Sequence, residues 1–501
     1  MDDSTLDTIR KERSISLIKK IIINWALNTT AHAFGNIIRA QSIIIRIIWT
    51  ICLLASTAYC FYLIIQTIVL YTKYEVNTRL NLVYETPTKF PAVTICNLNT
   101  FNADFSKESI EDVLNEKRIF ANQSKPIDFV ETASQQFKAP FNDPGFLQRN
   151  RLIYFGFFLR EMLGDCKYQR ENCFKEDFQL NENYYYGNCF TFNSDTQKTK
   201  LWKKTGIVNG LRLELYTGGQ EVYTYKTGFK VFVHNQSDTP FFDEEGIDVS
   251  VGQQTNIAIS RTFLNRLSEP HSNCIQNDNL DYYFKSNSFF KYIWTNFNFT
   301  RYTLKYCMKA CLQDYIVSQC ACFDTRLVLP IQTKLSLCIS TEQVECTIKS
   351  DIEFHNRKEI ISNCYEKCPN ECNKVIYHQT VSKSRYPTKW YSDLVNKSQM
   401  YLEVVKKSDL SHLEKNALVI NVYYDRNYYM SIDESPSMTF EDLLAFIGGN
   451  FGLFVGASML TFGEAIEIFF LIVFVYVSKY FNFNSKKREE VDINDIEMNR
   501  F

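Results

Sequence analysis

The sequence predicts a membrane protein in which two transmembrane helices flank a large, disulfide-rich α+β ectodomain. Three observations support this fold class. Two segments are far more apolar than the rest, the region between them holds most of the cysteines, and basic residues lie outside both apolar segments. At 501 residues the chain is also too long for one compact core, which indicates at least two structural units.

The two apolar segments are each long enough to cross a membrane once. Ile47–Tyr71 contains no charged residue, and Leu443–Ser478 is interrupted only by Glu464 and Glu467. A helix of about 20 apolar residues spans the roughly 30 Å hydrocarbon core of a bilayer. The predicted division is a cytoplasmic segment (1–42), a first transmembrane helix (43–71), an extracellular domain (72–440), a second transmembrane helix (441–478) and a cytoplasmic segment (479–501).

The flanking charges predict the orientation, because cytoplasmic loops carry an excess of lysine and arginine. We therefore expect a multi-pass protein of the plasma membrane with both termini in the cytoplasm. The net charge of −1 gives no indication of a nucleic-acid partner. The two apolar segments make the lipid bilayer the expected surrounding. The flanking basic residues are Arg10, Lys11, Arg13, Lys19, Lys20, Arg39 and Arg46 before the first segment, and Lys479, Lys486, Lys487 and Arg488 after the second.

The cysteines agree with this orientation. Of the 16 cysteines, Cys52 and Cys60 lie in the first apolar segment, and all the others lie in the predicted extracellular part. An even number of cysteines in an oxidising compartment is typical of a disulfide framework. Zinc binding is the alternative, because Cys320-Ala-Cys322 has metal-like spacing, but the predicted topology places this pair outside the reducing cytosol. Four sequons also fit an exposed, glycosylated domain: Asn122, Asn235, Asn298 and Asn396.

The extracellular part mixes predicted strands and helices, which indicates the α+β class. Alternating apolar residues, separated by turn clusters, predict strands. The predicted strands cover 90–97, 210–216, 228–234, 246–252 and 255–260, and the predicted helices cover 301–320 and 356–372 as far as Pro369.

Cysteine spacing suggests that these two helical segments are crosslinked. Residues four apart share one face of a helix, and this spacing recurs in Cys307/Cys311 and in the series Cys364, Cys368, Cys372. Two antiparallel segments with matched spacing can bond rung by rung, which would pair Cys307 with Cys368 and Cys311 with Cys364. Cys320 and Cys322 would then nest around Cys338 and Cys346, although spacing alone leaves other connectivities open.

The second apolar segment contains residues that an ordinary membrane anchor does not need. A glycine inside a helix costs roughly 1 kcal/mol relative to alanine. Close helix packing through small residues would explain the glycines but not the acids. On a continuous ideal helix, Gly449, Gly456, Gly463 and Glu467 share one narrow face, and Glu464 lies to its side. The glycines of this segment are Gly448, Gly449, Gly452, Gly456 and Gly463.

Carboxylates inside a membrane usually face a water-filled path, because exposure to lipid costs a few kcal/mol. The alternative is that Glu464 and Glu467 reach a membrane surface, since a continuous helix of this length would overshoot the bilayer. Backbone and hydroxyl oxygens near a narrow axis can replace the water around a small cation. The segment therefore predicts a cation pore with its constriction at Gly456-Ala457-Ser458 and with the glutamates attracting cations. One such helix cannot enclose a channel, so several subunits must each contribute one.

Several ordered motifs occur between roughly residues 30 and 480: FPAVTICN (90–97), NCFTFN (188–193), the cysteine set and IGGNFGLFVGAS (447–458). Together they resemble the motifs of the degenerin/epithelial sodium channel superfamily, which includes the acid-sensing ion channels. The resemblance implies a trimeric, amiloride-sensitive sodium channel with a β-sheet palm and a Gly-x-Ser selectivity site at Gly456–Ser458. It also implies seven disulfides: Cys96–Cys189, Cys166–Cys173, Cys274–Cys372, Cys307–Cys368, Cys311–Cys364, Cys320–Cys346 and Cys322–Cys338.

The resemblance indicates gating positions, and the sequence departs from the family pattern at some of them. Relatives carry a His-Gly pair before the first span, whereas His32 is followed by Ala33, and a glycine appears only at Gly35. Acid-sensing channels carry adjacent histidines just beyond a tyrosine, whereas no histidine occurs at Tyr74 or in the three residues after it. Ala445 matches the position at which bulky side chains hold degenerins open.

Together these observations predict a sodium-selective channel, opened by an extracellular ligand such as a neuropeptide, in which related subunits form a homo- or heterotrimer. Opening by protons, by mechanical load or without any stimulus is the alternative within the family. A non-conducting receptor or adhesion protein on two anchors is the alternative outside it. The motifs G-x-S-x-G and HExxH do not occur, so we expect no enzyme activity, cofactor or catalytic metal. The acidic run Asp243-Glu244-Glu245 is interpreted as a solvated loop, with cation or peptide binding as the alternative.

Overall fold

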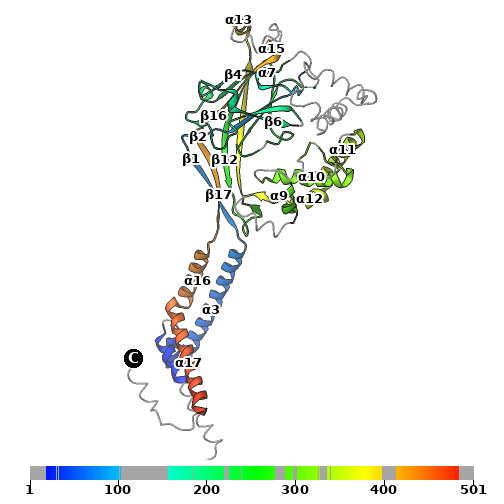
Figure 1. Ribbon diagram of the computed structural model, residues 1–501. Helices are drawn as coiled ribbons and strands as arrows, with labels where there is room; N and C mark the ends of the chain where they lie inside the picture. Colours follow the sequence, from blue (N-terminus) through cyan, green and yellow to red (C-terminus); the bar gives the residue numbers. More distant parts are fainter. Residues whose placement is uncertain are drawn as a thin grey trace, which may run out of the picture. The chain divides into compact units, whose positions relative to one another are not determined.

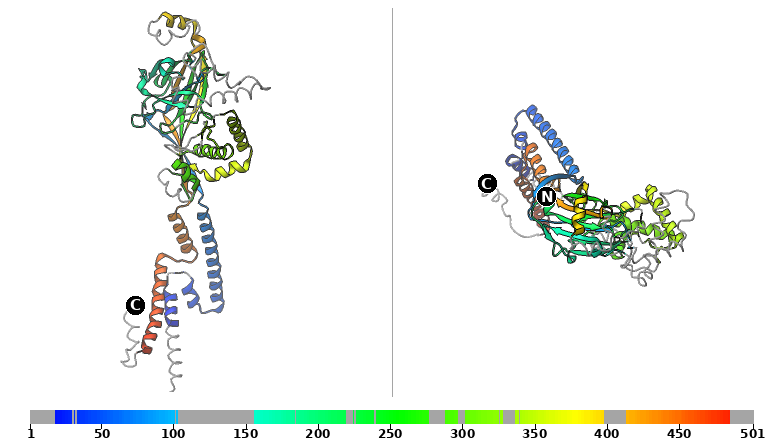
Figure 2. Two further views of the ribbon diagram at one scale, coloured as in Figure 1. Left: turned by 45° about the vertical axis from the view of Figure 1, so that its right-hand side comes forward. Right: turned by 90° about the horizontal axis from the view of Figure 1, so that it is seen from above.

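The computed structural model divides the chain into two compact units, which are described separately (Figures 1 and 2). We call Thr78–Ser435 the sheet unit, and Met1–Asn77 together with Pro436–Phe501 the helical unit. The structure describes residues 18–29, 31, 33–100, 102, 156–183, 185–218, 224, 226–238, 240–276, 288–296, 302–324, 326–327, 336–338, 340–397 and 413–484.

The sheet unit is organised around one large sheet (Figure 1). Its strands are β1 (Val76–Tyr84), β4 (Leu163–Tyr168), β5 (Glu171–Asn172), β9 (Leu211–Tyr216), β12 (Gln253–Asn265), β15 (Asn373–Arg385), β16 (Ala417–Tyr424) and β17 (Tyr428–Pro436). Their order among the described residues is β1-β17-β12-β16-β9-β4-β5, with β15 paired to β12 beside this path. β12 pairs antiparallel with β15 along its whole length and runs parallel to both β16 and β17.

A five-stranded sheet shares its core with the large one. Its order is β11-β10-β3-β7-β6, and side chains of both sheets form one buried cluster that includes Ile95, Phe192, Leu213 and Ile257. Burial of this apolar surface stabilises the unit. The strands are β3 (Ala92–Asn97), β6 (Phe178–Asn183), β7 (Gly187–Phe192), β10 (Phe229–His234) and β11 (Ile247–Val249), and two small pairs add β2 (Thr88–Lys89), β8 (Leu201–Trp202), β13 (Cys274–Ile275) and β14 (Asn370–Glu371).

A group of helices lies beside these sheets in both side views (Figures 1 and 2). It consists of α9 (Ser288–Asn296), α10 (Leu304–Cys320), α11 (Thr341–Asn356) and α12 (Lys358–Lys367). The Thr303 hydroxyl accepts from the Tyr306 N–H at 3.1 Å and so begins α10. α11, which the sequence analysis missed, begins with a capping box between Ser340 and Gln343. The unit also contains α7 (Leu159–Met162), α13 (Lys389–Lys397), α15 (Leu413–Asn416), η3 (Lys175–Asp177) and η4 (Ile207–Asn209).

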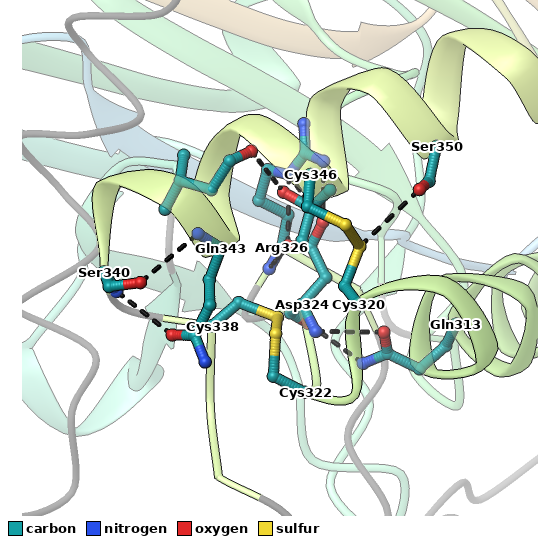
Figure 3. The surroundings of a disulfide bond; sticks show 12 residues. Gln313, Cys320, Cys322, Asp324, Arg326, Cys338, Ser340, Gln343, Cys346 and Ser350 are labelled. Carbon is teal, nitrogen blue, oxygen red and sulfur yellow. Dashed lines mark hydrogen bonds and ion pairs between the residues drawn. A yellow bond between two sulfur atoms is a disulfide. The ribbon is translucent and has the colours of Figure 1, made fainter.

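Seven disulfides crosslink the sheet unit, and their pairing is the one that the family resemblance implies. Cys307–Cys368 and Cys311–Cys364 join α10 to α12 and the residue that follows it, in the rung-by-rung arrangement inferred from spacing. Figure 3 shows the nested pair, in which Cys320–Cys346 and Cys322–Cys338 lie close to the ion pair of Arg326 with Asp324. Cys320 and Cys322 are therefore not free to bind zinc as thiolates. The remaining bonds are Cys96–Cys189, Cys166–Cys173 and Cys274–Cys372.

The helical unit consists of a helix over residues 18–28, α2 (Phe34–Arg39), α3 (Ile43–Thr72), α16 (Phe440–Phe454) and α17 (Met459–Asn484). Among the described residues, α3 is the one helix that is long and apolar enough to cross a membrane by itself. α16 and Met459–Val475 meet this condition together, as a pair bent by 77°. α3 packs against α16 through the rings of Tyr59 and Phe454, whose centroids are 5.2 Å apart.

Candidate functional site

The candidate site lies where α16 ends and α17 begins. The prediction of one continuous helix over 441–478 is wrong, because Val455 to Ser458 are not helical. Gly456 has a φ of +71°, in the left-handed region that a glycine adopts without steric cost. The N–H groups of Val455 and Ala457 both donate to the Phe451 carbonyl, at 3.0 and 3.2 Å, and so close the last turn of α16. A left-handed glycine just beyond the last turn is a common way for a helix to end.

Ser458 begins the next helix. Its N–H donates to the Thr461 hydroxyl at 3.0 Å, and its carbonyl accepts from the Phe462 N–H at 3.3 Å. Thr461 is buried, whereas the Ser458 side chain is exposed. The interruption therefore leaves the Gly456 and Ala457 backbone outside the regular helical pattern, between two helices whose ends are both well defined.

The break also changes how the glycines and acids are related. Because the two helices differ in direction by 77°, Gly449 on α16 does not share one straight helical face with Gly463 and Glu467 on α17. Beyond its chain neighbours and the adjoining backbone of its own helix, a Cβ added at Gly448, Gly449 or Gly463 would meet no described atom within 4 Å. Packing inside one subunit therefore gives no reason for these glycines.

Two hydroxyl groups that are not among the predicted site residues contact this region. Ser56 on α3 donates to the Phe454 carbonyl at 2.7 Å and so satisfies one of the last carbonyl groups of α16. Thr29, just after the helix over 18–28, donates to the Glu464 carboxylate at 2.7 Å. In the sequence, the one indication of these contacts was that each is a hydroxyl residue in a mainly apolar segment. Glu464 is half-buried at this contact, whereas Glu467 is exposed.

The acidic run in the sheet unit is exposed at Asp243 and Glu244, in agreement with a solvated loop, but it also makes ion pairs that the sequence did not indicate. Lys305 and Lys309, one turn apart on α10, pair with it: Lys305 lies 2.6 Å from Glu245, and Lys309 lies 3.2 Å from Glu244 and also contacts Asp243. Although partial burial alone would raise the pKa of Glu244, its ion pairs with Lys309 and Lys305 lower it. Its charge is therefore retained under mild acidification.

A cavity of about 1240 Å³ lies beside this loop. Its walls come from β6, the end of β10, the loop after β10, the first half of α10 and β15, and they carry both charged groups and aromatic rings. His234 lines it with its Nε2 2.8 Å from the Thr94 hydroxyl and its Nδ1 2.9 Å from the Asn235 carbonyl. Burial lowers the pKa of His234, so this histidine is neutral near pH 7. The described residues contain no group of three or more His, Cys, Asp or Glu side chains that could hold a metal ion.

A sequence profile described as amiloride-sensitive sodium channel matches residues 25–468. The chain belongs to this family. It is 27% identical over 472 residues to acid-sensing ion channel 1 of Gallus gallus, covering 90% of this chain and 83% of the relative. It is 27% identical over 479 residues to the bile acid-sensitive ion channel of Homo sapiens, covering 90% and 86%, and 28% identical over 332 residues to degenerin del-1 of Caenorhabditis elegans, covering 65% and 46%.

Membership of the amiloride-sensitive sodium channel family identifies the chain as an ion channel subunit rather than an enzyme. Among solved structures, a proton-activated chloride channel aligns over 85% of this chain and 97% of its own, at 8% identity. The TM-score of 0.31 is too low for this likeness to support any statement about the fold.

The predicted gating positions of this channel subunit have distinct surroundings. His32 lies outside the described residues, but Ala33, which replaces the expected glycine, has a φ of +73°, a conformation that favours glycine. Gly35 lies in α2, where an added Cβ would have ordinary contacts, 3.6 Å from the Ala26 carbonyl oxygen. Tyr74 has a φ of +52° and donates its N–H to the Tyr71 carbonyl at the end of α3. Ala445 is exposed on α16.

The four predicted glycosylation sites differ in their positions in the structure. Asn122 and Asn298 lie outside the described residues, and Asn396 lies in α13. Asn235 is half-buried at the wall of the cavity, and its side-chain N–H donates to the Ser237 hydroxyl at 2.9 Å. Glycosylation of this asparagine would have to compete with that contact.

Proposed function

We propose that this chain is one of three identical or related subunits of a sodium-selective cation channel in the plasma membrane. Residues 43–71 and 441–478 are the spans, 72–440 are extracellular, and 1–42 and 479–501 are cytoplasmic. Gly456, Ala457 and Ser458 form the selectivity site, Glu464 and Glu467 attract sodium ions below it, and amiloride blocks the channel. Family membership supports conduction, and the placement of the basic residues supports the orientation.

The observation that carries the proposal is the interruption at Gly456–Ser458. Non-helical backbone at membrane depth is tolerated only where it is buried in protein or lines a water-filled path. Within one subunit Gly456 and Ala457 are only half-buried, and Ser458 is exposed. Three copies around an axis would bring these backbone and hydroxyl oxygens together, where they can replace the hydration shell of a small cation.

The selectivity site is tested by reversal potentials in cells that express the full chain. Gly456→Ala places a Cβ where φ is +71°, and Ser458→Cys replaces a hard oxygen by a larger sulfur. We expect each variant to reduce the preference for sodium over potassium, by about tenfold or roughly 1.4 kcal/mol. Gly448→Ala is the matched control, because it lies inside α16 and an added Cβ meets nothing within 4 Å.

Unchanged reversal potentials in both variants, at normal surface expression, would refute the assignment of the selectivity site. Absence of any current from the unmodified chain, alone or with related subunits, would favour the alternative of a non-conducting receptor or adhesion protein.

For the stimulus, we propose an extracellular ligand, with a short basic neuropeptide favoured. The cavity beside α10 supports this choice, because it combines aromatic rings with acidic groups such as Asp238 and Glu371, and cations bind favourably over aromatic faces. Proton gating finds less support: the buried His234 has a lowered pKa, and so does Glu244. A bile acid is a further ligand class to test, since a relative is described as bile acid-sensitive.

A step from pH 7.4 to about 6 should therefore produce no rapid inward current in the homomer, because neither group becomes protonated in that interval. An amidated peptide library applied at pH 7.4 should contain an agonist, and Lys309→Glu at the cavity wall should shift its half-maximal concentration. A large current from acid alone would overturn this part of the proposal and favour proton gating, whereas current without any stimulus would favour constitutive opening.

A further inference from the structure

Along α3, all of which the structure describes, Ser56 is the one serine or threonine whose hydroxyl group bonds outside its own helix. It donates to the Phe454 carbonyl of α16 at 2.7 Å. Serine and threonine within a helix usually donate back to a carbonyl three or four residues earlier. The others do so: Thr50 to Arg46 at 2.8 Å, Thr57 to Leu53 at 2.6 Å, Thr67 to Leu63 at 2.9 Å and Thr72 to Val69 at 3.0 Å. The bond made by Ser56 is therefore not a general property of the hydroxyl groups in this span.

The carbonyl that Ser56 reaches has lost its ordinary partner. Phe454 is the last residue of α16, and in a continuous helix its carbonyl would accept from the N–H of Ser458, four residues later. That N–H instead donates to the Thr461 hydroxyl at 3.0 Å. An unsatisfied backbone group at membrane depth costs several kcal/mol, so the end of a helix there needs a donor from elsewhere. Ser56 supplies the donor that the break in the helix removes.

The peptide group between Phe454 and Val455 is held at both of its polar atoms. Its oxygen accepts from Ser56. Its N–H, which belongs to Val455, donates to the Phe451 carbonyl at 3.0 Å. A peptide group is planar, so bonds at both polar atoms fix its orientation. The left-handed turn at Gly456, where φ is +71°, starts from this fixed plane.

A second contact from α3 falls on the same residue. α3 and α16 lie side by side in both side views (Figures 1 and 2). Tyr59 comes three residues after Ser56, a spacing that places both on one face of a helix. Its ring lies edge to face with the ring of Phe454, at 5.2 Å between centroids. The first span therefore holds both the backbone and the side chain of the residue at which α16 ends.

We propose that Ser56 is a positioning residue for ion selectivity and acts through the Phe454 peptide group. This inference rests on the proposed selectivity site at Gly456–Ser458. While Ser56 occupies the Phe454 carbonyl, that oxygen does not turn toward a cation, and the peptide groups that follow keep their orientation. Loss of the hydroxyl frees the carbonyl to rotate and to bind a cation itself. The set of oxygens that replaces the hydration shell then changes, and with it the preference between ions of different size.

Adhesion between the two spans is the simpler role for such a hydroxyl group. Hydrogen bonds between membrane helices contribute to their association, whatever the position of the acceptor. Loss of adhesion alone would lower the amount of channel at the cell surface without changing which ions pass. The acceptor favours the specific role, because the Phe454 carbonyl lies only two residues before Gly456. The two roles thus differ in the quantity that they change.

Reversal potentials of the full chain, measured in sodium and in potassium solutions, test the proposal. Ser56→Ala removes the donor, and we expect it to reduce the preference for sodium about threefold at unchanged surface expression, since one hydrogen bond is lost. Ser56→Cys keeps a weak donor and should have an intermediate effect, which covers the case in which Ser56→Ala does not reach the surface. Thr57→Val is the matched control: Thr57 is also half-buried, but its hydroxyl is bonded within α3, so selectivity should not change.

A double variant, Ser56→Ala with Gly456→Ala, shows where the effect arises. Because both changes disturb the same turn, the double variant should be no less selective than Gly456→Ala alone. Normal reversal potentials in Ser56→Ala and Ser56→Cys, an equal change in Thr57→Val, or additive effects in the double variant would overturn the inference. If Gly456→Ala alters selectivity and Ser56→Ala does not, the selectivity site stands and the role of Ser56 is refuted. If neither variant alters it, the proposed selectivity site is refuted as well.

Discussion

The sheet unit and the helical unit differ in where their apolar side chains lie. In the sheet unit Phe90, Leu213 and Ile257 are 0% exposed within a single chain. In the helical unit Leu453, Met459 and Leu460 are 76%, 87% and 77% exposed. The sheet unit thus completes a core with its own residues, whereas the helical unit leaves large apolar side chains exposed within one chain. In the proposed pore, lipid and further copies of the chain would cover these side chains.

The crosslinks follow the same division. The seven disulfides all lie in the sheet unit, whereas Cys52 and Cys60, the free cysteines of the described residues, both lie in α3. We therefore expect the sheet unit to be most sensitive to the loss of a disulfide. The helical unit should be most sensitive to changes in side-chain volume or charge. The following tests are ordered from the largest expected effect to the smallest.

Removing a disulfide should affect the sheet unit most. Cys307→Ser with Cys368→Ser opens a bond between residues 61 apart, and chain-entropy arguments give a loss of about 4 kcal/mol in the free energy of unfolding. We expect a lower melting temperature and strongly reduced surface expression. Cys52→Ser in α3, which breaks no crosslink, should change neither quantity. Comparable losses in the two variants would contradict the contrast between the units.

Volume added to the helical unit should change gating rather than folding. Ala445→Cys, in the Cys52→Ser and Cys60→Ala background, should behave normally until a bulky thiol reagent is attached. Because the added group prevents close packing of the closed helices, we expect a severalfold rise in steady current after modification. The same reagent on Leu201→Cys, an exposed position of the sheet unit, should have no effect. Normal closure of the confirmed Ala445 adduct would remove Ala445 from the gating positions.

Charge changes below the constriction should have a smaller effect. Glu464→Gln and Glu467→Gln should each lower sodium conductance about twofold, because fewer cations are attracted to the pore. Thr29→Val should alter conductance only while Glu464 is present, since the hydroxyl acts through that carboxylate at 2.7 Å. Thr29→Ser, which keeps the donor, is the control. Additive effects of Thr29→Val and Glu464→Gln in single-channel recordings would show that the contact has no role in conduction.

The smallest effect is expected at Ala33. Because its φ of +73° is unfavourable for a side chain, Ala33→Gly should stabilise the start of α2 by about 1 kcal/mol. Hydrogen exchange of the amides in Phe34–Arg39 should become slower. Ala40→Gly, at a residue with a φ of −63°, should have no such benefit, because it only increases the freedom of the unfolded chain. Faster exchange in Ala33→Gly would mean that the backbone there is held by other contacts.

The sheet unit could be predicted from sequence further than the helical unit. Alternating residues over 255–260 indicated part of β12, and the four-residue cysteine spacing indicated both bonds between α10 and α12, because these signals are local and periodic. Helix α11 was missed because its sequence has no strong apolar face. The break at Gly456 was also missed, because a helix of small and apolar residues satisfies local rules equally well and only the observed backbone reveals the left-handed turn.

Contacts between distant segments were beyond sequence reasoning altogether. Thr29 and Glu464 are separated by more than 400 residues, and nothing in either segment specifies the other. The ion pairs of Lys305 and Lys309 with the acidic run were missed for the same reason.

The strand order has a consequence for how the chain is made. β16, which ends at Tyr424, lies between β9 and β12, and β17, which ends at Pro436, lies between β1 and β12. The large sheet therefore has a gap at its centre until synthesis has passed residue 436. Chains are made at about 5–20 residues per second, so the earlier strands wait many seconds for their partners. Throughout that interval the strands already made expose unpaired edges, which are surfaces on which other chains can pair.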